Sequence, residues 1–152
     1  MIETIRAAWA TAPPRFEASL GMRLQELEPG TATFALEAGP LNHNPMGTVH
    51  GGAVSTLADS VMGVAVATTL EDGESFTTLQ LSVNFLRPAT GGFLTARGIV
   101  RQRGKSVALT VCDVVDDRGR LIAHATATNM ILRGPQAEGR RPGEATGVAA
   151  AG

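Results

Sequence analysis

The distribution of apolar and polar residues changes along the chain, and its clearest feature is one long apolar stretch. Between residues 53 and 70 the only charged residue is Asp59. At 100° per residue, the apolar side chains of this stretch cover most of the circumference of a helix. They are Val54, Leu57, Ala58, Val61 and Ala65, with Met62 and Val66 beside them. The pattern therefore predicts one long helix that is buried on most sides.

The single carboxylate of this helix is its main chemical feature. Asp59 projects near Met62, Gly63 and Val66, which predicts that its side chain points into protein. An ionised carboxylate in such a place is costly unless it is paired, hydrogen-bonded or facing a polar cavity. The helix is long enough to cross a membrane, but serine and threonine residues interrupt it and no basic residues flank it. We therefore interpret it as a helix inside a globular protein and expect no membrane partner.

Alternation of apolar and polar residues, typical of half-buried strands, occupies most of the remaining chain. It predicts strands at 20–28 and 31–38 before the helix, and at 75–86, 93–103, 106–115 and 121–132 after it. Turn signals such as Pro29-Gly30 and Asp116-Asp117-Arg118-Gly119 separate them. The last four strands are predicted to form an antiparallel meander. A single helix of this kind needs a sheet around it, so the fold class is α+β, a curved antiparallel sheet wrapped around one central helix.

The ends of the chain lie outside this pattern. Residues 1–15 predict a short helix and a linker, and Pro13-Pro14 stop the helix. The helix either packs on the core or another subunit, or gates a substrate. Residues 16–133 form the one predicted domain. Residues 134–152 are rich in Gly, Pro, Ala and charge without periodicity, which predicts a flexible tail.

Composition narrows the class of protein. The chain has 152 residues, 43% of them hydrophobic and 18% charged, which suits one globular domain. A formal net charge of −1 argues against a nucleic-acid partner. The single cysteine, Cys112, excludes an internal disulfide framework and fits a reducing compartment. No basic segment followed by an apolar run opens the sequence, so we expect a cytoplasmic protein.

The loop before the helix carries the second candidate group. Gly51 and Gly52 lie where the helix begins, and the first N–H groups of a helix lack intrahelical partners and favour negative charge. Gly51 is therefore a candidate donor to an oxyanion, and Asp59 a candidate acceptor of a water proton. Asp59 is about two turns into the helix, so it cannot reach Gly51 of its own subunit. The helix of a partner could bring the two together.

The segment Asn44-Pro45-Met46-Gly47-Thr48-Val49-His50-Gly51-Gly52, followed by Asp59, resembles the signature of hotdog-fold acyl-CoA thioesterases. Within them it most resembles the phenylacetate-pathway (PaaI-like) branch, which includes the mammalian thioesterase superfamily member 2 type. The predicted strand order also fits that fold, over residues 16–133. The resemblance implies a hydrolase that converts an acyl-CoA thioester to a free acid and CoA. No cofactor is expected, and no metal, because the histidines and Cys112 lack zinc-ligand spacing.

The resemblance also implies roles for single residues. Asp59 resembles the catalytic carboxylate, acting as general base on a water or as nucleophile on the thioester. Gly51 resembles the residue whose backbone N–H binds the thioester oxygen, and Asn44 the one that helps to position the attacking water. His50 resembles a histidine beside the thioester. Thr78 falls where relatives carry a Ser or Thr that faces the site from the partner subunit.

The implied assembly is a homodimer with active sites built across its interface. Unpaired sheet edges favour a dimer with a continuous sheet on physical grounds, and we expect two dimers to pair into a homotetramer. The segment Arg103-Gly104-Lys105-Ser106 falls where relatives hold part of the CoA. Arg97 and Arg101 belong to the same basic cluster, which either meets CoA phosphates or forms a solvated strand face.

Structural alternatives stay open for these residues. Asp59 suits a buried acid bonded to backbone or hydroxyl groups, Asn44 a turn former, and Thr78 an ordinary strand residue. His50 suits a residue that bonds its loop. Among other functions, a non-catalytic acyl-CoA or lipid-binding module on the same fold is the main alternative. A hotdog dehydratase or hydratase ranks lower, because no His follows Asp59 on the helix.

Overall fold

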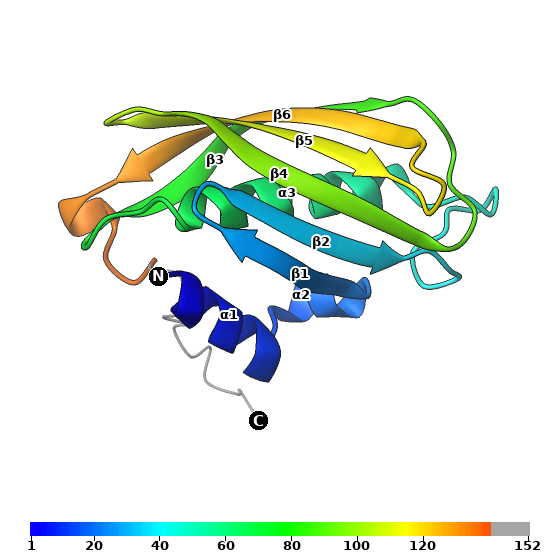
Figure 1. Cartoon of the computed structure of the whole chain (residues 1–152), viewed down its shortest axis with the longest axis horizontal. Helices are drawn as coiled ribbons and strands as arrows, with labels where there is room; N and C mark the ends of the chain where they lie inside the picture. The colour runs from blue at the N-terminus through cyan, green and yellow to red at the C-terminus, as the bar shows by residue number, and fades with distance from the viewer. Residues whose placement is uncertain (141–152) are drawn as a thin grey trace.

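A six-stranded antiparallel sheet curves around one central helix in the computed structural model, which describes residues 1–140 (Figure 1). The elements are α1 (Ile2–Thr11), α2 (Arg15–Ser19), β1 (Met22–Glu28), β2 (Thr31–Glu37), α3 (Gly51–Ala67), β3 (Ser75–Phe85), β4 (Phe93–Arg103), β5 (Val107–Val115), β6 (Leu121–Leu132) and the 3-10 helix η1 (Gly134–Gln136). The predicted α+β class, with a curved antiparallel sheet around one helix, is confirmed.

The order of the strands corrects one prediction. The sheet runs β1-β2-β4-β5-β6-β3, so β3 pairs with β6 at one edge and does not form a meander with β4. Residues 86–92 carry the chain past the end of β6, where the N–H groups of Leu86 and Arg87 donate to the carbonyl of Ile122. The prediction was wrong because alternation shows which face of a strand is buried, not which strand lies beside it.

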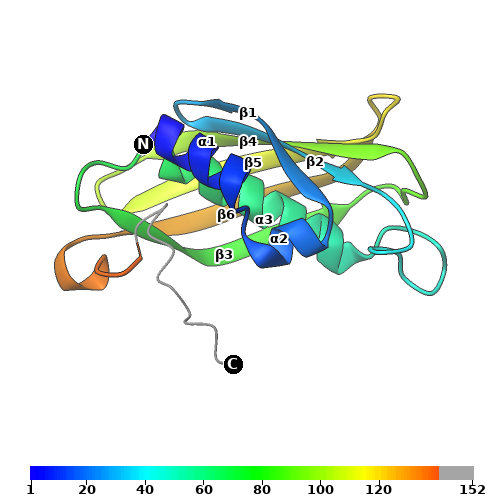
Figure 2. The same ribbon diagram turned by 90° about the horizontal axis from the view of Figure 1, so that it is seen from below.

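Helix α3 lies against the inner face of the sheet, and Figure 2 shows it running along the strands. Its apolar stripe is fully enclosed, since Leu57, Val61, Met62 and Val66 are 0% exposed. Gly98 on β4 permits this close packing, because a Cβ there would lie 2.8 Å from the carbonyl oxygen of Val61. Among the described helices none is long and apolar enough to cross a membrane.

The N-terminal segment forms two helices. Helix α1 packs on β1, and its Trp9 ring meets Phe34 edge-on with the ring centroids 4.6 Å apart. Helix α2 was not predicted, because its five residues are too few to show a periodic pattern. Ser60 on α3 donates a hydrogen bond to the Glu17 carboxylate of α2 at 3.1 Å. The segment thus covers the side of the fold next to β1.

Residues 134–140, the first part of the predicted tail, contain a short element that the sequence pattern did not predict. Residues Gly134–Gln136 form η1, Ala137 is 2% exposed, and the Ser75 hydroxyl donates to the Arg140 carbonyl. One buried alanine leaves no periodic signal in a sequence, which explains the difference. The rest of the predicted tail, 141–152, lies outside the described residues.

Candidate active site

The start of α3 presents one unused backbone donor. His50 is the N-cap: its Nδ1 accepts the Gly52 N–H at 2.8 Å, and its carbonyl accepts the N–H groups of Ala53 and Val54. Within residues 1–140, the N–H of Gly51 has no hydrogen-bond partner. A free N–H at a helix start combines a donor with the positive end of the dipole. The position therefore suits an oxyanion. Because His50 accepts the next three N–H groups of the helix, only the N–H of Gly51 is left free among the first four helix residues.

A cavity opens beside this donor. It has a volume of about 340 Å³ and borders Gly51, Val54, Phe85 and Arg87, among others. A Cβ on Gly51 would lie 3.3 Å from the ring of Phe85, at the end of edge strand β3. Glycine here thus keeps space between the helix start and the edge strand.

The candidate acid lies further along the helix, beside the same edge strand. Asp59 is half-buried, and its Oδ1 accepts a hydrogen bond from the Thr78 hydroxyl at 3.1 Å. Thr78 is on the edge strand β3, so no strand within residues 1–140 lies beyond it. The structure therefore brings the two predicted residues Asp59 and Thr78 together, with one carboxylate oxygen bonded and the side chain partly open.

A buried network that the sequence analysis missed lies behind Thr78. Asn129 on β6 is 1% exposed, and its amide reaches the hydroxyls of Thr78 and Thr110, each at 3.3 Å. The Thr110 hydroxyl in turn donates to the carbonyl of Ala127 at 3.3 Å. The sequence signal was present, because a lone Asn interrupts an apolar alternation on β6.

One chain does not bring the acid and the free N–H together. Eight residues of helix separate Gly51 from Asp59, which is about 12 Å along the axis. Both nevertheless border β3: Asp59 through Thr78, and Gly51 through Phe85. A single chain thus holds half of the expected site near each end of one free sheet edge.

Asn44 is engaged within its own loop. Its Oδ1 accepts the N–H groups of Met46 at 3.0 Å and Thr48 at 3.2 Å, and its Nδ2 donates to the Thr48 hydroxyl at 2.8 Å. In the single chain these bonds are those of a turn-forming residue. Asn44 therefore shapes the loop that leads to His50 and Gly51.

The residues of the predicted basic cluster lie in two different places. Arg103 and Arg133 both contact the Glu74 carboxylate, whose side chain is 3% exposed. Burial raises the pKa of Glu74, but the Glu71 backbone N–H and the two guanidinium groups outweigh it and hold the pKa below its usual value. Lys105 in the same turn is exposed. Of the four predicted CoA-binding residues, Arg103 thus has a partner in the chain, whereas the ammonium of Lys105 reaches solvent.

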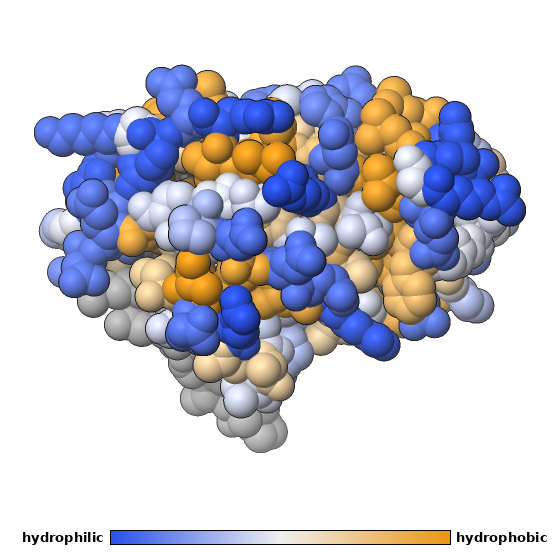
Figure 3. Space-filling view, in the orientation of Figure 1, coloured by the Kyte–Doolittle hydropathy of each residue, from blue (hydrophilic) through white to orange (hydrophobic). Residues whose placement is uncertain are grey.

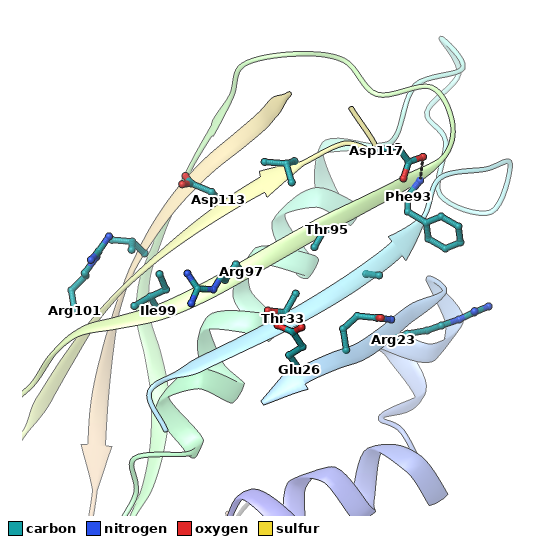
Figure 4. Close-up of a pocket in the computed structure, with 14 residues that line it drawn as sticks. Arg23, Glu26, Thr33, Phe93, Thr95, Arg97, Ile99, Arg101, Asp113 and Asp117 are labelled. Atoms are coloured by element: carbon teal, nitrogen blue, oxygen red, sulfur yellow. Dashed lines mark hydrogen bonds between the residues drawn. The ribbon is translucent and has the colours of Figure 1, made fainter. Parts of the chain in front are cut away.

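Arg97 and Arg101 lie elsewhere, on the outer face of the sheet. Both line a groove of about 890 Å³. Figure 4 shows their side chains on the side of the sheet away from α3. Figure 3 shows hydrophilic and hydrophobic residues interleaved over this face. This groove is larger than the cavity beside Gly51, but it contains neither the free N–H nor Asp59. It therefore does not enter the candidate site.

Other reactive groups among the described residues do not form a site. Burial raises the pKa of the Cys112 thiol to about 12, so the thiol stays protonated at neutral pH. No group of three His, Cys, Asp or Glu side chains suited to a metal ion occurs within residues 1–140.

Comparison with known proteins points to one family. The family model described as "Thioesterase superfamily" matches residues 46–123, which include His50, Gly51, Asp59 and Thr78. The acyl-coenzyme A thioesterase 13 of Pongo abelii is 30% identical over 83% of this chain and 90% of its own length. The medium/long-chain acyl-CoA thioesterase YigI of Escherichia coli K12 is 29% identical over 76% of this chain and 84% of its own.

Solved structures show the same architecture. A phenylacetic acid degradation-related protein of Ralstonia eutropha is 34% identical, with a TM-score of 0.73 over 82% of this chain and 97% of the other. A thioesterase family protein of Silicibacter pomeroyi is 30% identical, with a TM-score of 0.79 over 87% of this chain and 98% of the other. The hotdog arrangement implied by the sequence resemblance is thereby confirmed.

Proposed function

This chain belongs to the thioesterase superfamily, and on that premise we propose that it hydrolyses acyl-CoA thioesters to a free acid and CoA. The observation that carries the proposal is that two half-sites both border the edge strand β3. One half is the Asp59 carboxylate held by Thr78, and the other is the free N–H of Gly51. Hydrolysis of a thioester needs both an acceptor for a water proton and a donor for the oxyanion.

The proposed chemistry uses these groups in turn. The free oxygen of Asp59 takes a proton from water as the water attacks the carbonyl carbon, and the resulting oxyanion accepts the N–H of Gly51. Collapse of the intermediate releases the CoA thiolate, which is a good leaving group because thiols have a pKa near 8.5. The thiolate then takes up the proton that Asp59 removed from water, which returns Asp59 to its carboxylate form. Direct attack by Asp59 would instead form an anhydride. Hydrolysis of that anhydride at the Asp59 carbonyl carbon in ¹⁸O-labelled water would place the label on Asp59, whereas general-base catalysis leaves Asp59 unlabelled.

The proposed site needs a second copy of the chain. Asp59 and Gly51 are about 12 Å apart in one chain, yet both border the free edge of β3. Antiparallel pairing of two β3 strands about a twofold axis would bring the acid of one chain towards the helix start of the other. It would also cover the exposed side chains of Leu79 and Phe85, which are 56% and 57% exposed. We therefore propose a homodimer with two sites across its interface.

The faces of β3 limit the register of this pairing. Leu81 and Val83 pack on the core side, whereas Gln80, Ser82 and Asn84 are exposed. Paired residues in an antiparallel sheet share a face, so core-side residues must oppose core-side residues. A register centred on Ser82 meets this condition. The bulge of β3 lies next to Thr78. In this register the bulge is opposite the partner's Phe85, and Thr78 is therefore near the partner's Gly51.

The CoA moiety is proposed to extend towards residues 103–106 of the subunit that supplies Asp59. Thr78, Asn129, Ala108 and Arg103 are successive partners across β3, β6, β5 and β4. Three strand spacings, about 14 Å, therefore separate Thr78 from this turn. Lys105 and Ser106 are the exposed side chains there, with Gly104 shaping the turn. Arg103 instead fixes the turn through Glu74.

The outer sheet face suits the pairing of dimers. Its groove carries three basic and three acidic side chains, a balance that suits a second copy of the same face. They are Arg23, Arg97, Arg101, Glu26, Asp113 and Asp117. The homotetramer and the cytoplasmic location stay predictions.

Thiol release from a panel of short, long and aromatic acyl-CoAs tests the function, with Asp59→Asn as the matched variant. We expect wild-type turnover on at least one substrate and a loss of about 10²- to 10⁴-fold in kcat for Asp59→Asn, the range for losing a general base. Binding of acyl-CoA without thiol release would favour the non-catalytic module. Near wild-type activity of a folded Asp59→Asn protein would overturn the assignment of Asp59.

A further inference from the structure

A line of polar side chains crosses the inner face of the sheet directly behind Asp59. Asn129 on β6 is 1% exposed and lies in a row of buried apolar residues formed by Ala125, Ala127 and Ile131. A buried amide in such surroundings is costly unless its hydrogen-bonding groups are used. Its two ends reach the hydroxyls of Thr78 and Thr110. Asn129 therefore joins the hydroxyl that holds Asp59 to the interior of the sheet.

The direction of the hydrogen bonds in this line follows from the number of hydroxyl protons available. The hydroxyl of Thr78 has one proton and two acceptors in reach, Asp59 Oδ1 at 3.1 Å and Asn129 Oδ1 at 3.3 Å. A hydrogen bond to an ionised carboxylate is about twice as strong as one to a neutral amide. While Asp59 is ionised, the Thr78 proton is therefore directed to Asp59. The Asn129 oxygen would then face a lone pair of Thr78.

A half-turn of the Asn129 amide about its Cβ–Cγ bond removes this conflict. Its Nδ2 then donates to Thr78, and its Oδ1 accepts the hydroxyl proton of Thr110, which otherwise goes to the carbonyl of Ala127. Each proton is used once, and every bond points towards Asp59. Hydrogen bonds aligned in this way strengthen one another.

We propose that Asn129 is a positioning residue for the hydrolysis. Its amide makes the Thr78 hydroxyl a dedicated donor to Asp59 Oδ1, which orients the carboxylate. The other carboxylate oxygen is then left free for the attacking water. Asn129 contacts Thr78 and not Asp59, so it acts only through Thr78. The inference rests on the proposed function, because it assigns a role relative to Asp59.

A double-mutant cycle tests the role. Asn129→Leu keeps a similar shape and removes both amide groups, and Thr78→Val removes the hydroxyl. We expect kcat for thiol release to fall roughly 10- to 100-fold in Thr78→Val and roughly 3- to 10-fold in Asn129→Leu, with KM little changed. If Asn129 acts through Thr78, the double variant falls no further than Thr78→Val alone.

The controls separate this role from a structural one. Thr128→Val, on the opposite face of the same strand, should leave both kcat and KM unchanged. Thr110→Val removes the far end of the line and should act in the same direction as Asn129→Leu, which keeps the test available if Asn129→Leu does not fold. Additive losses in the double variant, or a wild-type kcat in a folded Asn129→Leu protein, would overturn the inference. If the wild-type chain releases no thiol, the proposed function itself fails, whereas an inactive Asp59→Asn with a normal Asn129→Leu refutes only the role of Asn129.

Discussion

Replacing Gly51 with proline removes the proposed oxyanion donor while sparing the helix. Proline is well accepted at the first position of a helix, where its missing N–H has no intrahelical acceptor. His50 before it has φ −61° and ψ 136°, the extended conformation that a residue preceding proline prefers. The helix bonds of Ala53 and Val54 to the His50 carbonyl do not involve Gly51. Gly51→Pro therefore deletes one N–H with little cost to α3.

The expected loss follows from the role of the donor. Removal of one oxyanion-hole hydrogen bond costs about 10²- to 10³-fold in kcat, or about 2.7–4 kcal/mol. The effect of losing the N–H must be separated from a steric effect, because any Cβ at residue 51 lies 3.3 Å from the Phe85 ring. Gly51→Ala is the matched control, because it introduces the same Cβ and retains the N–H. The contact is with the far end of the Phe85 ring, so a shift of a few tenths of an ångström relieves it, and we expect Gly51→Ala to lose less than about tenfold.

The assay is kcat for thiol release at saturating acyl-CoA, together with the urea midpoint of each variant. The reasoning predicts a kcat for Gly51→Pro well below that of Gly51→Ala, at similar midpoints. Equal losses in the two variants would show that the ring contact, and not the N–H, matters. A folded Gly51→Pro protein with wild-type kcat would refute the assignment of the oxyanion donor.

Two further predictions concern the interface and the ion cluster. Ser82→Cys should form an intersubunit disulfide on oxidation, visible on a non-reducing gel, because the proposed register places Ser82 on the twofold axis. The control Asn84→Cys should form none, because its two copies would lie about 14 Å apart. Cross-linking by Asn84→Cys alone would contradict the register. Because the pKa of Glu74 is lowered from 4.5 in the folded chain, its ionised form stabilises the fold above that pH, and this stability is lost as the pH falls through the folded pKa. Urea midpoints should therefore fall with pH below about 4.5, and less so in Glu74→Gln; parallel curves for the two proteins would contradict this.

Much of the fold was readable in the sequence because the period of the apolar residues differs between helix and strand. The stripe around Val61 located α3, and the alternating segments located six strands. The partner of β3 was not readable, because pairing with β6 instead of β4 leaves the alternation of β3 unchanged. Neither the five residues of α2 nor the single buried Ala137 is long enough to show the period of a helix or of a strand.

The candidate site was predicted in part for a similar reason. Asp59 and Gly51 stand out locally, one as the only charge on an apolar helix and the other as the glycine at its start. Asn129, by contrast, gains its meaning from Thr78, 51 residues away in sequence, through a hydrogen bond that only the folded sheet creates. The pairing of Arg103 with the buried Glu74 is likewise a tertiary contact, 29 residues apart, that the run of basic residues does not show.

The central claim is that each active site combines Asp59 of one chain with Gly51 of another, and mixed dimers test it most directly. Asp59→Asn and Gly51→Pro homodimers should each be nearly inactive. Co-refolding equal amounts with different tags should yield mixed dimers that contain one site with both residues intact. The account predicts recovery of about a quarter of the wild-type kcat per chain, because half of a random mixture is mixed and half of its sites are complete. No recovery, with mixed dimers demonstrated by sequential tag purification, would contradict a site shared between two chains.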